Sequence, residues 1–291
     1  MTDETPVQPE LEPEEGTKEK GILLLFRFVL VPLIVVGVVV FVIVLFGNIA
    51  LKEKSVRDYL YDIRSGSKSE RWQAAYHLSN LLANPKKNYE DEARKNLPEI
   101  LEIYKRARGT DPEIRRYLAL ALGRLKDSRA LPALQDSIND EDSQTVIWSI
   151  WALGAIGDRT AVPALIDKME SQDEAFRVMS AYALGVIGDE KAIPSLQAHL
   201  DDSSAEVSWN SAIALARMNN ASGAGILMKM LDRDYLAGFP NMSESSKQEL
   251  LVNAIKASDR LNDPGLNDLI VKLSKSDPNL TVRDTAIKAL Q

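Results

Sequence analysis

The sequence predicts an all-α protein, built as an α-solenoid of about seven helix pairs that is preceded by one transmembrane helix. Two observations lead to this prediction: an uncharged apolar stretch near the N-terminus, and short motifs that recur every 31 residues further along the chain. A recurring unit of that length is too short to fold alone, but stacked copies can share one hydrophobic core. The 291 residues therefore divide into an acidic tail over 1–20, a transmembrane segment over 21–51 and a solenoid over 52–291.

The N-terminal tail is strongly acidic. Residues 1–20 contain seven acidic and two basic side chains, three prolines and few large apolar groups. Such a segment cannot bury enough apolar surface to offset the entropy that ordering costs. The tail is therefore predicted to be disordered.

The membrane prediction depends on residues 28–51, which contain no charged side chain and only one strongly polar residue, Asn48. With a rise of ~1.5 Å per residue, a helix of this length can cross a hydrocarbon core about 30 Å thick. A cleaved signal peptide would have a shorter apolar region.

The orientation of this segment follows from the basic residues on its two sides. Five basic residues follow the stretch within 52–68 and three precede it within 18–27. The positive-inside rule therefore favours a solenoid on the cytoplasmic side, and the opposite orientation stays open.

Two motifs define the repeat. Pro132, Pro163 and Pro194 are spaced 31 residues apart, and each lies at the start of an apolar helical pattern. The tripeptide Ala-Leu-Gly lies near the end of a second helical pattern and recurs with the same spacing, first at residues 121–123. Proline is well tolerated in the first turn of a helix. Each unit is therefore predicted to be a pair of helices.

Aspartates and glycines mark the predicted helix ends. Asp127, Asp158 and Asp189 stand where an N-cap is needed before the proline-containing helices. A second set of aspartates stands before the second helix of a pair, where a negative charge favours the helix dipole; these are Asp111, Asp142, Asp173 and Asp277. The glycines of the Ala-Leu-Gly motif lie near helix ends, where close packing or termination requires the absence of a side chain.

The last unit, residues 277–290, shows most clearly which family the repeat resembles. Its pattern is carried by Asp277, Pro278, Val282, Arg283, Ala286, Ala289 and Leu290. This pattern resembles HEAT repeats, and the 31-residue units look most like the subfamily named after phycobilisome lyases. The resemblance covers about residues 54–291 and implies seven antiparallel helix pairs whose second helices line the concave face. Repeats one and six are the least regular, and residues 233–247 are an insertion that lengthens a turn.

The resemblance also implies a structural role for a column of arginines. Arginines recur at one position of the second helix. In this family that column tends to pair along the stack with the aspartates that precede the second helices, here Asp111, Asp142, Asp173 and Asp277. The arginines are Arg71, Arg115, Arg177 and Arg283. We therefore expect a ladder of ion pairs that stabilises the stack, rather than a catalytic set of carboxylates.

No motif predicts an enzyme. The chain has no cysteine, and its two histidines, His77 and His199, lack neighbouring partners, so both are interpreted as lone surface histidines. No phosphate-binding or nucleophile motif is present, and we predict no catalytic residue, no metal and no cofactor. Residues 52–291 carry 32 Lys and Arg against 35 Asp and Glu. This near-balanced charge argues against a nucleic-acid partner.

The second helices of repeats three to five carry an unusual set of apolar and aromatic residues opposite their inward faces. A surface helix is expected to be polar there. One interpretation is that the middle repeats pack tightly on both neighbours. The other is an exposed aromatic patch on the concave face that binds a protein partner. The candidate partner-binding residues are Ile147, Trp148, Trp151, Val178, Tyr182, Trp209 and Ile213.

Taken together, these features predict a membrane-anchored scaffold or adaptor, of a repeat type that is common in bacterial proteins. It would bind a protein partner of unknown identity on the concave face, and residues 28–51 would tether it as a single-pass membrane protein. An alternative is an accessory subunit of a larger membrane complex, in which the apolar helix packs among other spans. A phycobilin-lyase-like or other enzyme on the same fold is the third interpretation, because fold alone does not determine function.

Overall fold

The computed structural model describes residues 31–50, 54–84 and 89–291, and within 31–50 it describes the side chains of 31 and 33–42. The predicted disordered tail over 1–20 lies outside these residues. The chain contacts separate a unit that ends at Lys54 from a second unit, Ser55–Gln291.

Helix α2 (Val31–Ala50) belongs to the first unit and falls inside the predicted membrane segment. Its described apolar side chains, such as Leu33 and Phe41, are exposed. In the part of the chain that the structure describes, no helix has both the length and the apolar character that crossing a membrane requires. The transmembrane helix predicted over 21–51 is therefore not supported. Residues 21–30 and 51 of that segment lie outside the described residues.

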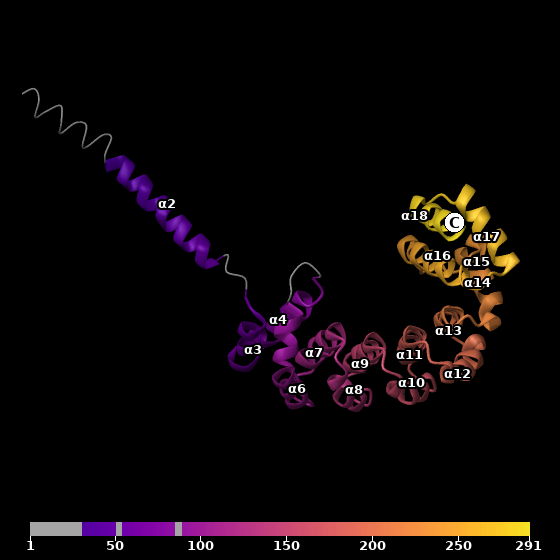
Figure 1. Ribbon diagram of the computed structural model, residues 1–291, viewed down its shortest axis with the longest axis horizontal. Coiled ribbons are helices and arrows are strands. Elements are labelled where there is room, and N and C mark those ends of the chain that lie inside the picture. The colour runs from indigo at the N-terminus through magenta and orange to yellow at the C-terminus, as the bar shows by residue number, and fades with distance from the viewer. Residues whose placement is uncertain (1–30, 51–53, 85–88) are drawn as a thin grey trace, which may run out of the picture. The chain divides into compact units, whose positions relative to one another are not determined.

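The second unit is an all-helical solenoid (Figure 1), which confirms the predicted fold class for these residues. Antiparallel helix pairs follow one another through it, and no strand occurs in the described residues. The pairs are α3 (Val56–Ser65) with α4 (Lys68–Leu81), α6 (Leu97–Arg106) with α7 (Pro112–Leu125), α8 (Leu131–Ser137) with α9 (Ser143–Ile156), α10 (Val162–Met169) with α11 (Glu174–Ile187), α12 (Ile193–Ala198) with α13 (Ala205–Arg217), α14 (Ala224–Met230) with α16 (Glu244–Ser258), and α17 (Pro264–Ser276) with α18 (Leu280–Ala289). Two short helices stand outside this pattern: α5 (Tyr89–Lys95), and α15 (Arg233–Ala237) in the predicted insertion.

The aspartates predicted as N-caps of the proline-containing helices cap short 3-10 turns just before those helices instead. The carboxylates of Asp127, Asp158 and Asp189 accept hydrogen bonds from main-chain N–H groups two residues later, and each of them starts a short 3-10 turn. The first helix follows directly, with its proline in the first turn. Gly157 and Gly188 end α9 and α11 in the left-handed conformation, at φ of 78° and 69°. A side chain is disfavoured there, so glycine stops each helix at a fixed register.

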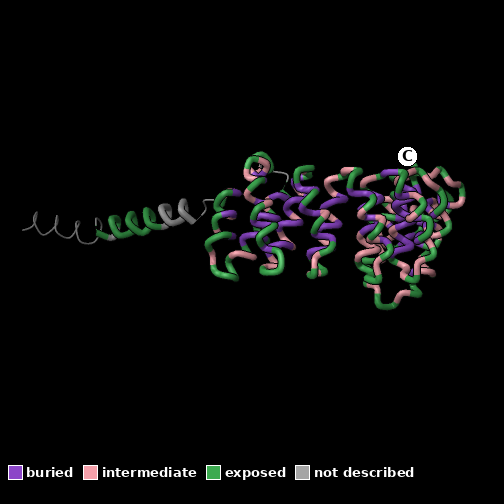
Figure 2. The backbone as a smooth tube through the Cα atoms, turned by 90° about the horizontal axis from the view of Figure 1, so that it is seen from below, coloured by how far each residue is buried: buried purple, intermediate pink, exposed green. Residues whose placement is uncertain are grey.

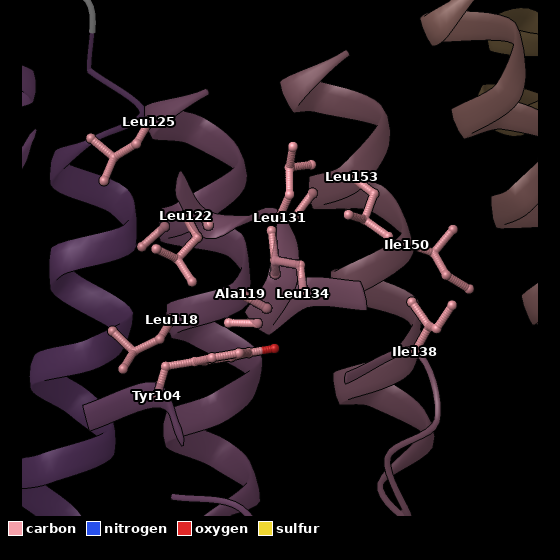
Figure 3. Close-up of a cluster of buried hydrophobic side chains, with 14 of the residues drawn as sticks. Tyr104, Leu118, Ala119, Leu122, Leu125, Leu131, Leu134, Ile138, Ile150 and Leu153 are labelled. Carbon is pink, nitrogen blue, oxygen red and sulfur yellow. The ribbon is translucent and has the colours of Figure 1, made fainter. Parts of the chain in front are cut away.

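The hydrophobic core lies between the two layers of helices, and buried segments follow it along the whole second unit (Figure 2). In its N-terminal half, side chains of α6, α7, α8 and α9 interdigitate (Figure 3), as with Leu118, Leu134 and Ile150, all fully buried. Tyr104 is buried among them, and its hydroxyl lies 3.1 Å from the Oγ of Ser149. Each repeat therefore completes the core of its neighbour.

The second helices approach one another most closely at the glycines of the Ala-Leu-Gly motif. A Cβ on Gly154 would lie 2.8 Å from the Cα of Ala183, and one on Gly185 would lie 2.6 Å from the Cβ of Ala214. A Cβ on Gly123 would meet the backbone of Ala152 at 2.7 Å. The predicted reason for these glycines was close packing or termination, and the structure shows close packing.

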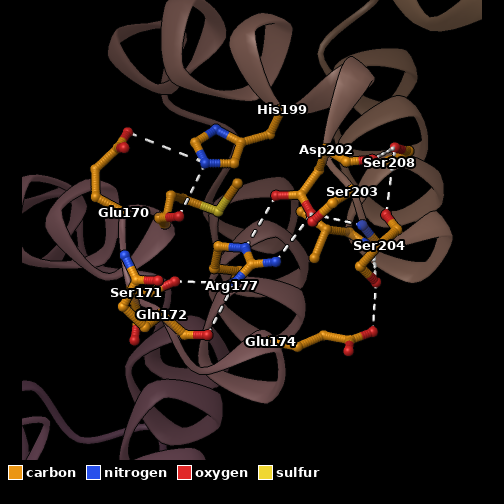
Figure 4. Close-up of polar contacts among 12 residues, drawn as sticks. Glu170, Ser171, Gln172, Glu174, Arg177, His199, Asp202, Ser203, Ser204 and Ser208 are labelled. Carbon is orange, nitrogen blue, oxygen red and sulfur yellow. Dashed lines mark hydrogen bonds and ion pairs between the residues drawn. The ribbon is translucent and has the colours of Figure 1, made fainter.

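Ion pairs cross from one repeat to the next, as the arginine column predicted. Arg71 lies 3.2 Å from Asp111 of the following repeat. Arg177 donates two hydrogen bonds of 2.9 Å to the carboxylate of Asp202, and a third to the carbonyl of Ser171 (Figure 4). These bonds hold the pKa of Asp202 below its ordinary value. Paired guanidinium and carboxylate groups of this geometry are stronger than single contacts.

Among the described residues, the only ion pair that joins a predicted arginine to a predicted aspartate is Arg71–Asp111. Asp202 was not a predicted partner of Arg177, and the remaining predicted pairs also differ. Arg115 is buried and pairs with Asp140. Asp142 instead binds Arg116, whose hydrogen bonds lower the pKa of Asp142 to about 2. Asp173 caps α11 instead of joining the ladder. Asp277 binds Arg233 of α15, and Arg283 reaches only the main-chain carbonyl of Asp277. The repeat spacing predicted the column but not the choice between neighbouring carboxylates.

The two histidines are not equivalent. His77 is exposed, as predicted, and stacks on Tyr59 with ring centroids 6.2 Å apart. The prediction was wrong for His199, which is buried. Its two ring nitrogens each lie 2.8 Å from a main-chain carbonyl, that of Ser195 in α12 and that of Met169 in the preceding repeat. Figure 4 shows the His199 ring between the two repeats. His199 therefore joins two repeats.

Replacing Gly154 by alanine is expected to lower the free energy of unfolding by about 1–3 kcal/mol. The added methyl would meet the backbone of Ala183, which cannot move without separating α9 from α11. Urea unfolding followed by circular dichroism would measure the change. The control is Gly225→Ala in α14, where a Cβ meets nothing within 4 Å, and there we expect no loss. Equal destabilisation by both variants would contradict the close-contact explanation.

Candidate functional site

The second helices line the inner side of the curve that this unit forms (Figure 1). Positions 31 residues apart lie at equivalent places on successive helices, and we call each such set a row. One row contains Leu120, Trp151, Tyr182 and Ile213. A second row lies one helical turn later and contains Arg124, Ala155, Val186 and Arg217.

Two neighbouring hollows follow these rows. The first, which we call the aromatic hollow, has a volume of about 410 Å³ and is lined by Leu82, Ala83, Gly123, Arg124, Lys126, Trp151, Ala155, Tyr182 and Val186. The second, the basic hollow, has a volume of about 450 Å³ and is lined by Gly185, Val186, Gly188, Arg217, Asn253, Lys256, Ala257 and Arg260. Val186 lines both. Together they form the inner-face groove.

The groove owes its shape to the same glycines that set the spacing of the helices. Trp151 lies over Gly123, and a Cβ on Gly123 would come within 2.7 Å of the indole ring. The ring is therefore held against the preceding helix, with its other side toward the hollow. Trp148 meets Trp151 edge to face, with centroids 6.4 Å apart. This contact fixes the orientation of both rings.

The structure brings part of the predicted patch together on the groove. Trp151 is half-buried and Tyr182 is 36% exposed, and both line the aromatic hollow. Ile147, Trp148 and Val178 are partly buried beside them. The remaining two residues are core residues, since Trp209 is only 2% exposed and Ile213 is 7% exposed.

Trp209 is covered by residues of the insertion. Its ring packs edge to face on Phe239 at 5.0 Å and on Tyr235 at 6.5 Å, and these two rings also contact each other. The insertion, which includes α15, thus covers the last residue of the row that contains Ile147, Val178 and Trp209. The exposed aromatic surface is therefore shorter than the sequence indicated.

Two aromatic residues that the sequence analysis missed lie on α4 and α7, on the N-terminal side of the predicted patch. Tyr76 of α4 is 41% exposed and packs edge to face on Tyr117 of α7, with centroids 5.3 Å apart. Tyr117 in turn stacks on Trp72 at 6.3 Å. Tyr117 lies 31 residues before Trp148, so extending that row by one repeat would have identified it.

The groove also contains cations that the sequence analysis did not single out. Neither hollow is lined by a carboxylate. Among the described residues, none of the cations at the two hollows is paired with a carboxylate; they are Arg124, Lys126, Arg217, Lys256 and Arg260. Most of the other arginines of the solenoid, such as Arg71 and Arg177, are paired. The groove is therefore positively charged on a chain whose net charge is −7.

Two of these cations are held in place by uncharged neighbours. The Arg217 guanidinium lies over the Tyr182 ring, 5.7 Å from its centroid. Arg124 donates to the main-chain carbonyl of Ser79 in α4, and its partial burial lowers its pKa. A guanidinium that has lost part of its hydration gains more from meeting a carboxylate than a fully hydrated one does.

The described residues contain no group of three or more His, Asp or Glu side chains arranged to hold a metal ion.

Two variants are expected to separate core aromatics from groove aromatics. Trp209→Ala should lower the free energy of unfolding by about 3–5 kcal/mol, because it leaves a cavity under α15. Tyr182→Ala should cost less than about 1 kcal/mol, because its ring is partly in solvent. Urea denaturation would measure both. If Tyr182→Ala is as destabilising as Trp209→Ala, the aromatic hollow is not an open surface.

Comparison with known proteins agrees with the fold. The family model described as HEAT repeats matches residues 97–171 and 162–237. The complex of CpcE and CpcF of phycocyanin lyase from Nostoc sp. PCC7120 is similar in structure, with a TM-score of 0.58 and 19% identity, over 82% of this chain and 87% of that one. A designed armadillo repeat protein in complex with the peptide (KR)4 gives a TM-score of 0.47 and 15% identity, over 81% of this chain and 98% of that one. A search of curated proteins finds no match.

At these identities the structural likeness shows the fold alone. The family match covers the repeats that build the aromatic hollow between α7, α9 and α11. On the family match and the repeated helix pairs, residues 97–237 are HEAT repeats.

Proposed function

We propose that this protein is a binding scaffold that holds a protein partner in the inner-face groove. The supporting observation is the aromatic hollow, where a volume of about 410 Å³ is open beside exposed Tyr182 and Val186. A hollow that combines aromatic and aliphatic side chains with a few polar groups is typical of a binding site. Solenoids of HEAT and armadillo type commonly bind proteins on such surfaces.

The groove suits an extended segment of a partner. It runs across successive helices, so a bound chain would meet a similar set of positions at each repeat. Trp151 and Tyr182 provide large, rigid contact areas, and such aromatic side chains commonly supply much of the binding energy at protein interfaces. Val186, shared by the two hollows, would contact the segment at its centre.

Membrane tethering is a second part of the proposal. It is supported by the uncharged run over 28–51 and by the exposed apolar side chains of α2, such as Leu33 and Phe41. An apolar surface of this extent is normally covered by lipid or by another protein. A tether would raise the local concentration of a partner at the bilayer, so that a modest affinity for the groove suffices. An accessory subunit of a membrane complex would cover α2 with other helices instead.

A lyase-like activity is the competing function. The complex from Nostoc named above is that of a phycocyanin lyase, but the likeness concerns the fold, which hosts many functions. A chromophore that absorbs visible light and purifies with the protein would favour that alternative.

Partner capture should depend on the aromatic hollow. The full-length protein would be purified from its native membranes in mild detergent and the captured proteins identified by mass spectrometry. Tyr182→Ser/Val186→Ser is expected to reduce capture of a groove partner about tenfold or more, because it removes two exposed contacts at the centre of the groove. Circular dichroism would show that the variant is folded.

The matched control is Tyr61→Ser/Ile287→Ser, which removes two exposed apolar side chains from α3 and α18, outside both hollows. It should leave capture unchanged. If capture is the same for both variants and the unaltered protein, the groove is not the binding site.

The membrane prediction can be tested by cysteine labelling, since the chain has no cysteine of its own. A membrane-impermeant maleimide should label Glu10→Cys and Asn241→Cys from opposite sides of sealed membranes, because an apolar helix between them would cross the bilayer. Labelling of both from one side, or loss of the protein from the membrane on washing at high pH, would contradict a transmembrane tether.

A further inference from the structure

We propose that the inner-face groove binds an acidic, extended peptide segment whose central residues are apolar. This inference rests on the proposed binding function and adds the chemistry of the partner. The physical basis is the order in which charged and apolar side chains follow one another along the groove.

The row that runs through both hollows is cationic at its ends and apolar in its middle. It reads Arg124, Ala155, Val186 and Arg217, one residue from each of α7, α9, α11 and α13. Because neither hollow is lined by a carboxylate, a bound segment could place acidic residues at both ends without repulsion from the lining. Its central side chains would face the apolar positions.

The cationic character is stronger at the C-terminal end of the groove. There Lys256 and Arg260 approach Arg217 from the other wall of the basic hollow, where α16 faces α11 and α13. A carboxylate in this hollow would have three cations near it. At the other end, Arg124 and Lys126 offer two. The partner is therefore expected to carry more acidic residues beyond one end of its apolar centre than beyond the other.

The helix spacing sets the length of the segment. Packed helices lie about 10 Å apart, so the three intervals from α7 to α13 span about 30 Å. An extended chain rises about 3.3 Å per residue, which corresponds to about nine residues between the two cationic ends. A peptide of about twelve residues would fill the groove.

A single-stranded nucleic acid fits the same groove less well. It also combines stacking with negative charge, but it carries a phosphate at every nucleotide. Phosphates over Ala155 and Val186 would lose water without meeting a cation, which is costly.

The cations could instead have a purely structural role. Arg124 and Arg217 lie in the last turns of α7 and α13, where a positive charge stabilises the helix dipole. That role predicts that removing the charges lowers thermal stability and leaves binding unchanged. Binding and melting temperature must therefore be measured on the same variants.

The probe is a fluorescein-labelled peptide of about twelve residues, with a central Leu-Phe-Leu flanked by glutamates, and two further peptides replace the glutamates by glutamines or by lysines. Fluorescence anisotropy with the full-length protein in mild detergent would measure binding at ~50 mM and ~300 mM salt. We expect the acidic peptide to bind about tenfold or more tightly than the glutamine peptide, and salt to weaken it. The lysine peptide should bind weakest.

The variant Arg217→Gln/Lys256→Gln/Arg260→Gln should weaken the acidic peptide about tenfold or more and affect the glutamine peptide little. The control Lys191→Gln/Lys229→Gln/Lys275→Gln removes three exposed cations that line neither hollow, and it should leave binding unchanged. Equal binding of the acidic and glutamine peptides, an equal effect of both variants, or tighter binding of an oligouridylate of similar length would overturn the inference. A last outcome separates the two proposals. If Arg217→Gln/Lys256→Gln/Arg260→Gln still captures native partners while Tyr182→Ser/Val186→Ser does not, the groove binds a protein partner but that partner is not acidic.

Discussion

The close contact between successive second helices is the constraint on which the solenoid depends. Gly123, Gly154 and Gly185 each face an alanine of the next helix, and no Cβ fits in between. Helix pairs of this length cannot bury a core alone, so their stability comes from the neighbours that this contact brings close. The same contact places Trp151 over Gly123. The groove and the stack therefore have one geometric origin.

Polar interactions give the stack its register. A guanidinium that crosses between repeats, as from Arg177 to Asp202, loses most of its strength if the repeats shift, because both hydrogen bonds depend on direction. His199 adds a second connection through two main-chain carbonyls. Buried ion pairs contribute little net stability on their own. Their contribution here is to allow one alignment of neighbouring repeats rather than several.

Packing and binding compete for the same side chains on the inner face. Where the insertion folds back, Trp209 is covered by Tyr235 and Phe239 and belongs to the core. Where no insertion exists, Tyr182 remains partly in solvent and Arg217 lies over its ring. A regular solenoid thus acquires a groove of limited length. At its C-terminal end the basic hollow is lined by Arg217, Lys256 and Arg260.

The sequence by itself determined the repeat, its 31-residue period and the ends of most helices. These features depend on interactions within a few residues, such as the cap that Asp158 provides and the left-handed turn at Gly157. Only the tertiary structure decided which residues of the concave face are exposed and which carboxylate Arg115 pairs with. It also brought Lys256 and Arg260 into one hollow with Arg217. Burial and charge clustering arise between segments far apart in the chain, so a local pattern does not contain them.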